Sequence, residues 1–126
     1  MLFRSKSQPN PLVMDWLIEA REEITVDPIV MGEIWQGIVA LPEGRRKRNL
    51  IEWFTRRRVE FPCLDWTLET AIVWAELRDA IRRDGHTVSV TDTMIAATAK
   101  LHGLTVATRN VDDFIRCGVP VVNPFE

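Results

Sequence analysis

The stretch SVTDTMIAATAKLHG, residues 89–103, decides the fold because it carries signals for both ends of a helix. Ser89 can cap the helix while the carboxylate of Asp92 reaches back to the first free backbone N–H groups. Gly103 fits the left-handed residue that ends many helices. Ala96 and Ala99 share the face of Asp92, one and two turns further on. The stretch alone leaves open whether Asp92 only caps the helix or also binds a ligand above this small-residue face.

Helix and strand signals alternate on both sides of this stretch. The caps at Asn10, Asp27 and Thr67 open helices that we expect over 11–20, 28–40 and 68–84, and a further helix follows Gly44. Strands are expected at EITV (23–26), FPCLDW (61–66), LTVAT (104–108) and VPVVNP (119–124). Because helices separate the strands and hairpin turns are absent, the sequence predicts a single α/β domain with a mostly parallel sheet.

The composition is that of an ordinary globular protein, with 46% hydrophobic and 27% charged residues in 126 positions. No apolar run approaches the roughly 20 residues that cross a bilayer, and the first residues lack the pattern of a secretory signal. Cys63 and Cys117 have no partnering motif, which favours buried free thiols in a cytosolic protein over a disulfide or a metal site.

Positive charge is concentrated in one short segment. Between residues 45 and 58 the only acid is Glu52, so this segment carries +6 in a chain of net charge −2. Its basic residues are Arg45, Arg46, Lys47, Arg48, Arg56, Arg57 and Arg58. The segment is either a binding surface for a polyanion or an acidic partner, or a solvated helix face.

Polar residues follow the predicted strands at positions where a site would form. Glu33 follows the first predicted strand, at the margin of an apolar helix face, and either pairs with a basic residue or faces a cation. Thr108, Arg109 and Asn110 follow a later strand, and Asp92 opens the helix that leads into it. Since sites in parallel sheets lie beyond the carboxyl ends of the strands, we expect these groups to converge on one rim.

Two adjacent acids, Asp112 and Asp113, follow the same strand and are either solvated turn residues or part of that rim. Carboxylates pressed together repel unless hard cations such as Mg²⁺ or Mn²⁺ bind between them. Such a site can activate water and stabilise the leaving oxygen of a phosphodiester, with the basic helix nearby holding the phosphate backbone.

The sequence resembles the PIN-domain ribonucleases, in particular the VapC-type toxins of toxin–antitoxin pairs and the related FitB-like group. The resemblance covers nearly the whole chain and rests on GEIWQGIVALPEGRRKRNL, AELRDAIRRDG, SVTDTMIAATAKLHG, VATRNVDDF and VNPFE. It implies a three-layer α/β/α sandwich and a metal-dependent endoribonuclease that uses Mg²⁺ or Mn²⁺. It also implies RNA as substrate, a cognate antitoxin and a homodimer as partners.

The resemblance also implies which residues form the site. The acids of the two motif helices correspond to Glu33 and Asp92, which the family uses to bind metal. The position after the Thr-Arg pair is Asn110, where many members have Asp, and Asp113 can supply the charge one helical turn later. Thr108 corresponds to the hydroxyl residue that accompanies this position.

One departure from the family pattern is expected to matter. Family members begin with a central strand that ends in a metal-binding Asp, whereas MLFRSKSQPNPLVMDWL shows neither a strand nor an acid in that place. We therefore expect the N-terminal strand to be missing. Either Met1 is an internal methionine of a longer natural protein, or the chain is a shortened, inactive relative that binds antitoxin or RNA.

Other residues have weaker predictions. Arg78 lies in the apolar arc of its helix, and we expect an ion pair with a site acid, or otherwise contact with RNA phosphate together with Arg109 and the basic segment. The spacing of the tryptophans favours core or interface positions, and Trp35 and Trp53 are candidates for contact with an antitoxin helix or a second subunit. A regulatory domain phosphorylated at Asp92 is a further alternative, although phosphoacceptors usually end a strand.

Overall fold

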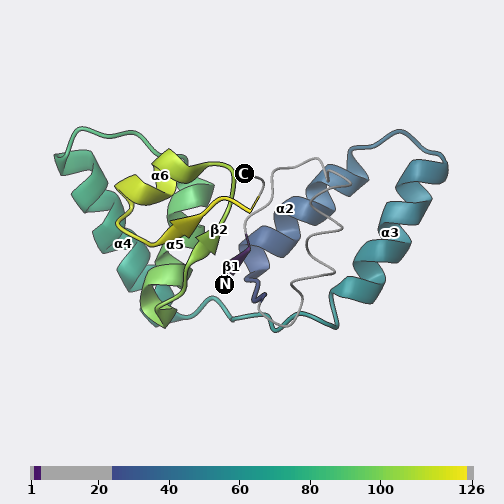
Figure 1. Cartoon of the computed structure of the whole chain (residues 1–126), viewed down its shortest axis with the longest axis horizontal. Coiled ribbons are helices and arrows are strands. Elements are labelled where there is room, and N and C mark those ends of the chain that lie inside the picture. Colours follow the sequence, from purple (N-terminus) through teal and green to yellow (C-terminus); the bar gives the residue numbers. More distant parts are fainter. Residues whose placement is uncertain (1, 4–23, 125–126) are drawn as a thin grey trace.

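The computed structural model describes residues 2–3 and 24–124 (Figure 1). The helices are α2 (Pro28–Val39), α3 (Arg45–Arg57), α4 (Leu68–Arg83), α5 (Val90–His102) and α6 (Val111–Arg116). The strands are β1 (Leu2–Phe3), β2 (Val106–Ala107) and β3 (Val121–Val122). The helix predicted over 11–20, with Trp16, lies outside the described residues.

The predicted caps account for where the long helices begin. Asp27 Oδ1 accepts a hydrogen bond from Val30 N at 2.9 Å at the start of α2. Thr67 and Thr70 form a reciprocal capping box at the start of α4, in which Thr70 N donates to Thr67 Oγ1 at 3.2 Å. These bonds satisfy backbone donors that have no partner inside the helix. The predicted helices over 28–40 and 68–84 are therefore confirmed within one residue.

Every pairing in the described part of the sheet is parallel. β1 pairs with β2, and β2 pairs with β3. Single bridges extend the sheet on the other side of β1, from Leu2 to Thr25 and from Val26 to Cys63. The segments 23–26 and 61–66, predicted as strands, therefore form only isolated bridges. The predicted strands at 104–108 and 119–124 contain β2 and β3. The α/β class and the mostly parallel sheet are confirmed.

The prediction that an N-terminal strand is missing is wrong. Leu2–Phe3 forms β1, which lies between Thr25 on one side and β2 on the other. Leu2 is 0% exposed, and its backbone N–H donates to the carbonyl of Thr105 at 2.8 Å. Without β1, backbone N–H and C=O groups of the segments on both sides would be unpaired. A strand of only two residues is therefore favoured at this place in the sheet. The residue after β1 in the sequence is Arg4, so no acid follows this strand directly.

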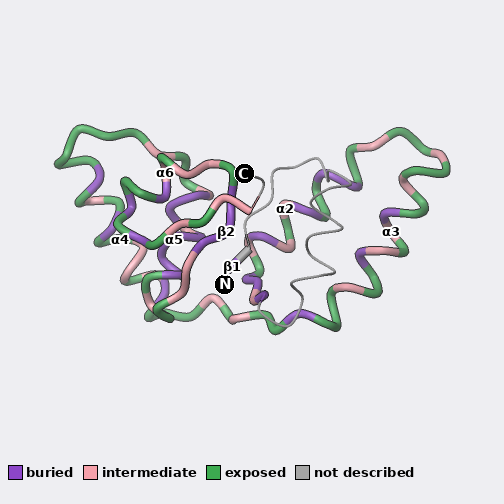
Figure 2. The backbone as a smooth tube through the Cα atoms, in the orientation of Figure 1, coloured by how far each residue is buried: buried purple, intermediate pink, exposed green. Residues whose placement is uncertain are grey.

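The helix α5 is the most deeply buried of the described helices. Its buried residues run almost without a break, and they are Asp92, Thr93, Ile95, Ala96, Ala97, Thr98 and Ala99. Figure 2 shows this helix largely in the colour of buried residues, whereas α3 is mostly exposed. Small side chains let α5 lie close to α4, to α2 and to α6. Gly103 ends α5 with φ of 65°, which an L side chain rarely adopts, and the chain turns into β2.

The helices lie in two groups along the long axis of the molecule. In Figure 1, α4, α5 and α6 lie on one side of the sheet region, and α2 and α3 lie on the other, with α3 at the far end. Trp35 of α2 packs against Phe54 of α3, with ring centroids 5.0 Å apart. Among the described residues, no helix combines the length and apolarity needed to cross a membrane.

Candidate functional site

The first turn of α5 fixes the position of Asp92. Ser89 Oγ accepts a hydrogen bond from Asp92 N at 3.2 Å, which confirms Ser89 as the cap. The carboxylate of Asp92 is only 3% exposed, and its Oδ2 accepts a hydrogen bond from a residue 18 positions later, Asn110. The carboxylate therefore connects α5 to the chain segment beyond β2.

The side-chain amide of Asn110 lies between two carboxylates. Its Nδ2 donates to Asp92 Oδ2 at 2.8 Å and to Asp113 Oδ2 at 2.8 Å. The backbone N–H of Asn110 donates to Thr108 Oγ1 at 3.0 Å, which holds the turn between β2 and α6 in place. The structure thus brings together four of the predicted site residues at one end of β2.

The two adjacent acids at the start of α6 have different surroundings. They lie in the first turn of α6 and not in a loop, so the alternative of solvated turn residues is wrong for Asp113. Asp113 also receives a charged contact from Arg116 Nη1 at 3.3 Å. Asp112 is exposed to solvent. Of the two acids, only Asp113 shares the Asn110 amide with Asp92.

Both cysteines are free thiols as predicted, but the prediction of burial is wrong for Cys63, which is exposed, and only Cys117 is buried near the two carboxylates. Cys117 is 2% exposed, and its backbone N–H donates to the carbonyl of Asp113 at 3.2 Å. Burial raises the pKa of the Cys117 thiol to about 11, and the negative charges of Asp92 and Asp113 add to the effect. The thiol is therefore protonated at neutral pH and contributes no further charge to the site.

The Asn110 amide nitrogen marks a point where a cation fits. Two carboxylate oxygens from different helices accept from that nitrogen, so the amide donor occupies the position that a cation between them would take. The Asn110 side chain would have to move aside to bind the same ion through its oxygen. Mg²⁺ binds through one or two protein carboxylates and keeps several water molecules. The donor set of Asp92, Asp113 and Asn110 fits that chemistry, although no group of three or more Asp, Glu, His or Cys side chains in the described part is close enough to share one ion.

Glu33 lies on a third helix, α2, which packs against α5. It is half-buried, with its Oε1 buried from solvent. No hydrogen bond between described residues joins it to Asp92, Asn110 or Asp113. The structure brings the α5 and α6 groups together as predicted, and the convergence of Glu33 on the same rim stays a prediction.

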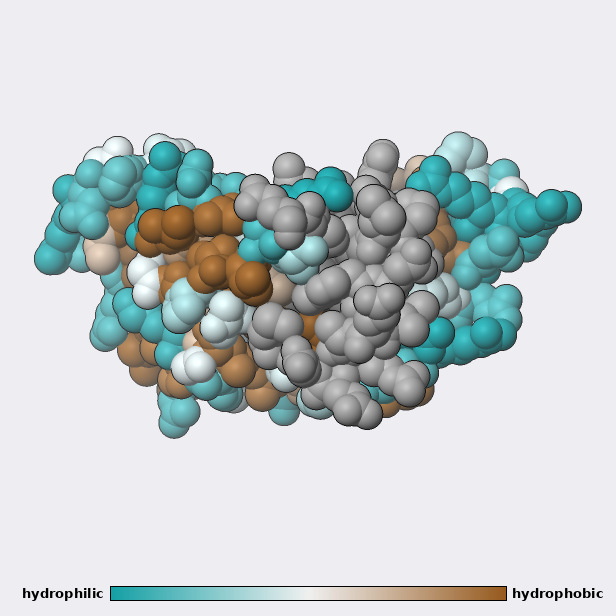
Figure 3. Space-filling view, in the orientation of Figure 1, coloured by the Kyte–Doolittle hydropathy of each residue, from teal (hydrophilic) through white to brown (hydrophobic). Residues whose placement is uncertain are grey.

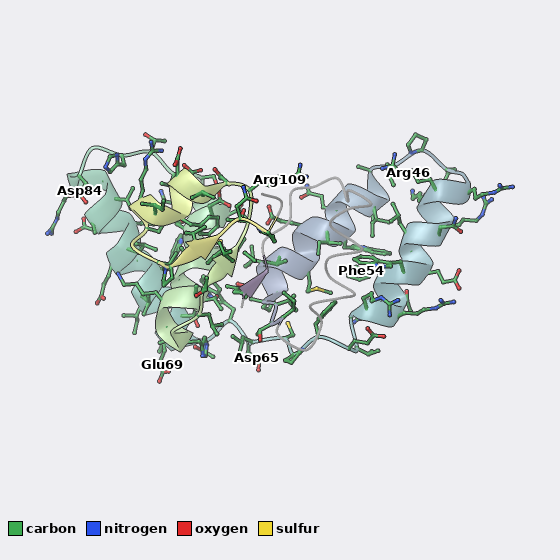
Figure 4. The ribbon with its side chains drawn as sticks, viewed as in Figure 1. Arg46, Phe54, Asp65, Glu69, Asp84 and Arg109 are labelled. Carbon is green, nitrogen blue, oxygen red and sulfur yellow. The ribbon has the colours of Figure 1, made fainter. Side chains whose placement is uncertain are left out.

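The basic segment lies away from these carboxylates. It forms α3 and the residue after it, and Figure 4 shows Arg46 at the α3 end of the molecule while Arg109 lies in the middle. The prediction of a basic helix next to the carboxylates is wrong for a single chain. Three of its residues pair locally, in the ion pairs Lys47–Glu43, Arg56–Glu52 and Arg57–Glu60. Arg45, Arg46, Arg48 and Arg58 are exposed.

The predicted ion pair of Arg78 with a site acid is also wrong. Arg78 is exposed, and its guanidinium carbon lies 5.6 Å from the ring centroid of Trp74. The half-buried indole of Trp74 covers the apolar part of this α4 face. The Arg78 guanidinium therefore stays at the surface, in a cation–π contact with the indole ring. Among the described tryptophans, Trp53, Trp66 and Trp74 are half-buried, and Trp35 is 39% exposed.

Two contacts of α5 were not predicted from the sequence. Trp74 Nε1 donates to Thr93 Oγ1 at 3.1 Å and so joins α4 to the first turn of α5. Thr98 Oγ1 donates to Asp27 Oδ2 at 2.9 Å, and both residues are buried. The sequence signal for both was the presence of threonines on the otherwise apolar α5 face, since a buried hydroxyl needs a hydrogen-bond partner.

The comparisons with known proteins agree with this geometry. The PIN domain model matches residues 2–119. The plasmid stability protein StbB of Pseudomonas syringae pv. tomato is 34% identical to this chain, over 96% of the chain and 90% of that protein. The toxin FitB of Neisseria gonorrhoeae is 32% identical over 95% of this chain and 89% of its own. The VapC ribonuclease Y4jK of Sinorhizobium fredii is 29% identical over 96% and 89%.

Solved structures show the same fold. The crystal structure of FitAcB from Neisseria gonorrhoeae superposes with a TM-score of 0.85 at 29% identity, covering 100% of this chain and 99% of that one. A toxin–antitoxin complex from Klebsiella pneumoniae gives a TM-score of 0.64 at 24% identity, covering 99% and 98%, and supports the fold alone. By the family match across residues 2–119 and by its relatives, this chain belongs to the PIN domain family.

Proposed function

We propose that this protein is the ribonuclease toxin of a toxin–antitoxin pair, and that it hydrolyses phosphodiester bonds of RNA in the cytoplasm. The observation that carries the proposal is the Asn110 amide nitrogen, 2.8 Å from a carboxylate oxygen of Asp92 and 2.8 Å from one of Asp113. Two carboxylates facing one donor are an arrangement that suits a hard divalent cation. The relatives named as a VapC ribonuclease and as a toxin support the reaction class.

Asp92 and Asp113 would hold Mg²⁺ or Mn²⁺, with Asn110 turning its oxygen toward the ion and Glu33 as a further carboxylate on α2. A divalent ion bound there supplies Lewis acidity at the scissile phosphate and lowers the pKa of bound water. Thr108 keeps the Asn110 backbone in position, and burial of Asp92 keeps its carboxylate in one orientation. The contribution of the chain is therefore to fix the donors before the substrate arrives.

RNA would be held by cationic side chains outside this cluster. Arg109 is exposed and lies next to Asn110 in the sequence, so it is a cationic side chain near the two carboxylates. The exposed basic residues of α3 and Arg58 would attract more distant phosphates of a long RNA, because charge attraction to the backbone does not require a specific contact. Arg78 would contribute from α4.

An antitoxin would neutralise the activity by binding this chain. A solved structure of FitAB, 29% identical to this chain, and the relative named as the toxin FitB support such a partner. A surface hollow of about 410 Å³ between α2 and α3 has apolar and aromatic walls that include Met31, Trp35 and Phe54. Such a hollow suits the apolar face of a partner helix. Association of two copies of the chain is part of the same proposal.

The test is cleavage of a labelled structured RNA by the full chain with Mg²⁺ or Mn²⁺. Asp92→Asn removes the carboxylate charge but keeps an oxygen that accepts from Asn110, so we expect cleavage to fall about 100-fold or more. The free energy of unfolding should change by no more than about 1–2 kcal/mol, the size of a helix-cap effect. Asp113→Asn should lower cleavage to a similar extent.

Asp112→Asn is the matched control, because Asp112 is the exposed neighbour of Asp113 on the same helix. The Asp112→Asn variant should cleave RNA at a rate within about twofold of the unchanged chain, because surface substitutions usually have small effects. Equal losses in the Asp112 and Asp113 variants would contradict the assignment of the site. If the chain binds RNA or antitoxin without cleaving, it is instead the inactive binding relative, which the absence of an acid directly after β1 favours.

A further inference from the structure

A second surface hollow, of about 610 Å³, lies at the end of α4 and extends to the first turn of α5. We call it the Arg78 groove. Its lining residues are Arg78, Asp79, Ile81, Arg82, Gly85, His86, Thr87, Val88 and Thr93. The groove therefore begins at the turn between the two helices and ends at the residue that follows Asp92 in the sequence.

The wall of the groove is connected to the first turn of α5. Arg78 lies over the Trp74 ring, and Trp74 Nε1 donates to Thr93 Oγ1 at 3.1 Å. Thr93 Oγ1 in turn donates to the carbonyl of Val90 at 2.5 Å. This chain of contacts connects Arg78 to the helical turn that carries Asp92. The Trp74 ring favours guanidinium positions over its face, at the edge of the groove.

The charge of the groove is positive. Arg78 has no carboxylate partner among the described residues, and its charge is uncompensated. Arg82 donates to Asp79 Oδ1 at 2.7 Å, and the neighbouring Arg83 contacts Asp79 Oδ2 at 2.9 Å. One carboxylate thus faces two guanidinium groups there. His86 and the hydroxyl of Thr87 add hydrogen-bonding groups on the same wall.

We propose that the Arg78 groove binds the backbone phosphates of a single-stranded RNA segment that flanks the bond cut at Asp92. The proposal rests on the proposed function, and it adds where the substrate runs on this side of the site. The groove reaches Thr93 in the first turn of α5, and the same turn carries Asp92. A guanidinium is suited to phosphate because it donates two parallel hydrogen bonds.

The experiment measures RNA affinity and cleavage separately for three arginine variants. Arg82 and Arg83 form a matched pair, since both contact Asp79 and their side chains are 75% and 73% exposed, but only Arg82 lines the groove. Binding of a labelled single-stranded RNA is measured in the Asp92→Asn background, so that the RNA stays intact. The salt dependence of the Kd is recorded for each variant.

We expect Arg78→Ala to raise the Kd about tenfold, the effect of losing one charged hydrogen-bonding contact. Arg82→Ala should raise the Kd less, because Asp79 partly compensates the charge of Arg82. Arg83→Ala should leave the Kd within about twofold of its value in the Asp92→Asn background. The dependence of log Kd on log salt should decrease by about 0.7 for Arg78→Ala, the value for one phosphate contact to a single strand. In the catalytically intact chain, Arg78→Ala should raise KM for a long RNA more than it lowers kcat.

Equal effects of Arg82→Ala and Arg83→Ala, together with an unchanged Kd for Arg78→Ala, would overturn the groove while RNA cleavage itself persists. Absence of cleavage by the unaltered chain with Mg²⁺ or Mn²⁺ would instead overturn the proposed function. If Arg78→Ala weakens binding of an acidic antitoxin segment and not of RNA, the groove is a protein-binding surface and the proposal is wrong.

Discussion

The two ends of the molecule differ in how they use burial and charge. The α5–α6 end buries Asp92 and shares one amide between two carboxylates. The α3 end buries only Leu50 and Phe54 of its helix, and it exposes a series of cations. Figure 3 shows hydrophilic surface over the α3 end and an apolar patch beside α6 on the same face. The carboxylate end is built for fixed geometry, and the basic end for attraction at a distance.

This difference separates two requirements of an enzyme that acts on a polyanion. Fixed donors need a packed surrounding, because a shift of about 1 Å can lower a rate 100-fold. Attraction of a phosphate backbone needs only charge and tolerates movement. In the proposed ribonuclease, α5, which is buried between other elements, would supply the first. The helix α3, which is supported mainly along one side by α2, would supply the second.

The largest expected effect tests whether the two ends unfold together. Ile95 is 0% exposed on α5, and Ile95→Ala should lower the free energy of unfolding by about 3–4 kcal/mol. Phe54→Ala should cost about 3 kcal/mol through the cavity left against Trp35. Hydrogen exchange should then rise throughout the chain for Ile95→Ala, but mainly in α2 and α3 for Phe54→Ala.

Urea unfolding provides the two free energies, and mass spectrometry locates the exchange. Val39→Ala on the exposed face of α2 serves as the control. It should change neither the free energy of unfolding nor the hydrogen exchange by a measurable amount. A uniform rise of exchange in the Phe54 variant would contradict the division into two ends.

A smaller effect is expected at the shared amide. Asn110→Asp replaces a donor to two carboxylates with a third carboxylate, and it should lower the free energy of unfolding without metal by about 2 kcal/mol. Mg²⁺ should restore stability in this variant more than in the unchanged chain, because a ligand that binds only the folded state stabilises it.

Thermal unfolding with EDTA and with Mg²⁺ measures both parts of this prediction. Asp112→Asn should respond to Mg²⁺ like the unchanged chain, since Asp112 is exposed and outside the shared amide. An Asn110→Asp protein that gains no additional stability from Mg²⁺ would exclude a cation between Asp92 and Asp113.

The smallest effect belongs to the basic end. The exposed ion pair of Arg56 and Glu52 on α3 should contribute no more than about 0.5 kcal/mol, as expected for surface pairs one helical turn apart. A double-mutant cycle with Arg56→Ala and Glu52→Ala measures it. A coupling energy above about 1 kcal/mol would show that the basic end is held as firmly as the carboxylate end.

The first residues of the helices were predictable where the sequence has a capping side chain. Asp27, Thr67 and Ser89 each accept the backbone bond that their position predicts. In contrast, α6 begins at Val111, and the side chain of its cap residue Asn110 forms no cap bond because it donates to the two carboxylates. β1 has only two residues, too few for the alternation that identifies a strand.

The contacts that assemble the site were not predictable in the same way. Sequence spacing placed Asp92 and Asn110 at related ends of elements, but it cannot show which atom lies between two carboxylates. The exposed position of Arg78 depends on Trp74 being held by Thr93, a contact between helices. The distance of α3 from the site depends on how α2 and α3 pack together, which no local pattern records.

The short separation of Asp92 and Asn110 has a consequence for the order of folding. The bond between them closes a loop of 18 residues, whereas the bond of Thr98 to Asp27 closes one of 71. Loop-closure entropy makes the longer closure about 1.2 kcal/mol more costly. Contacts near in sequence also form faster than distant ones. The carboxylate pair can therefore assemble as a local unit during folding, before the N-terminal half docks onto α5.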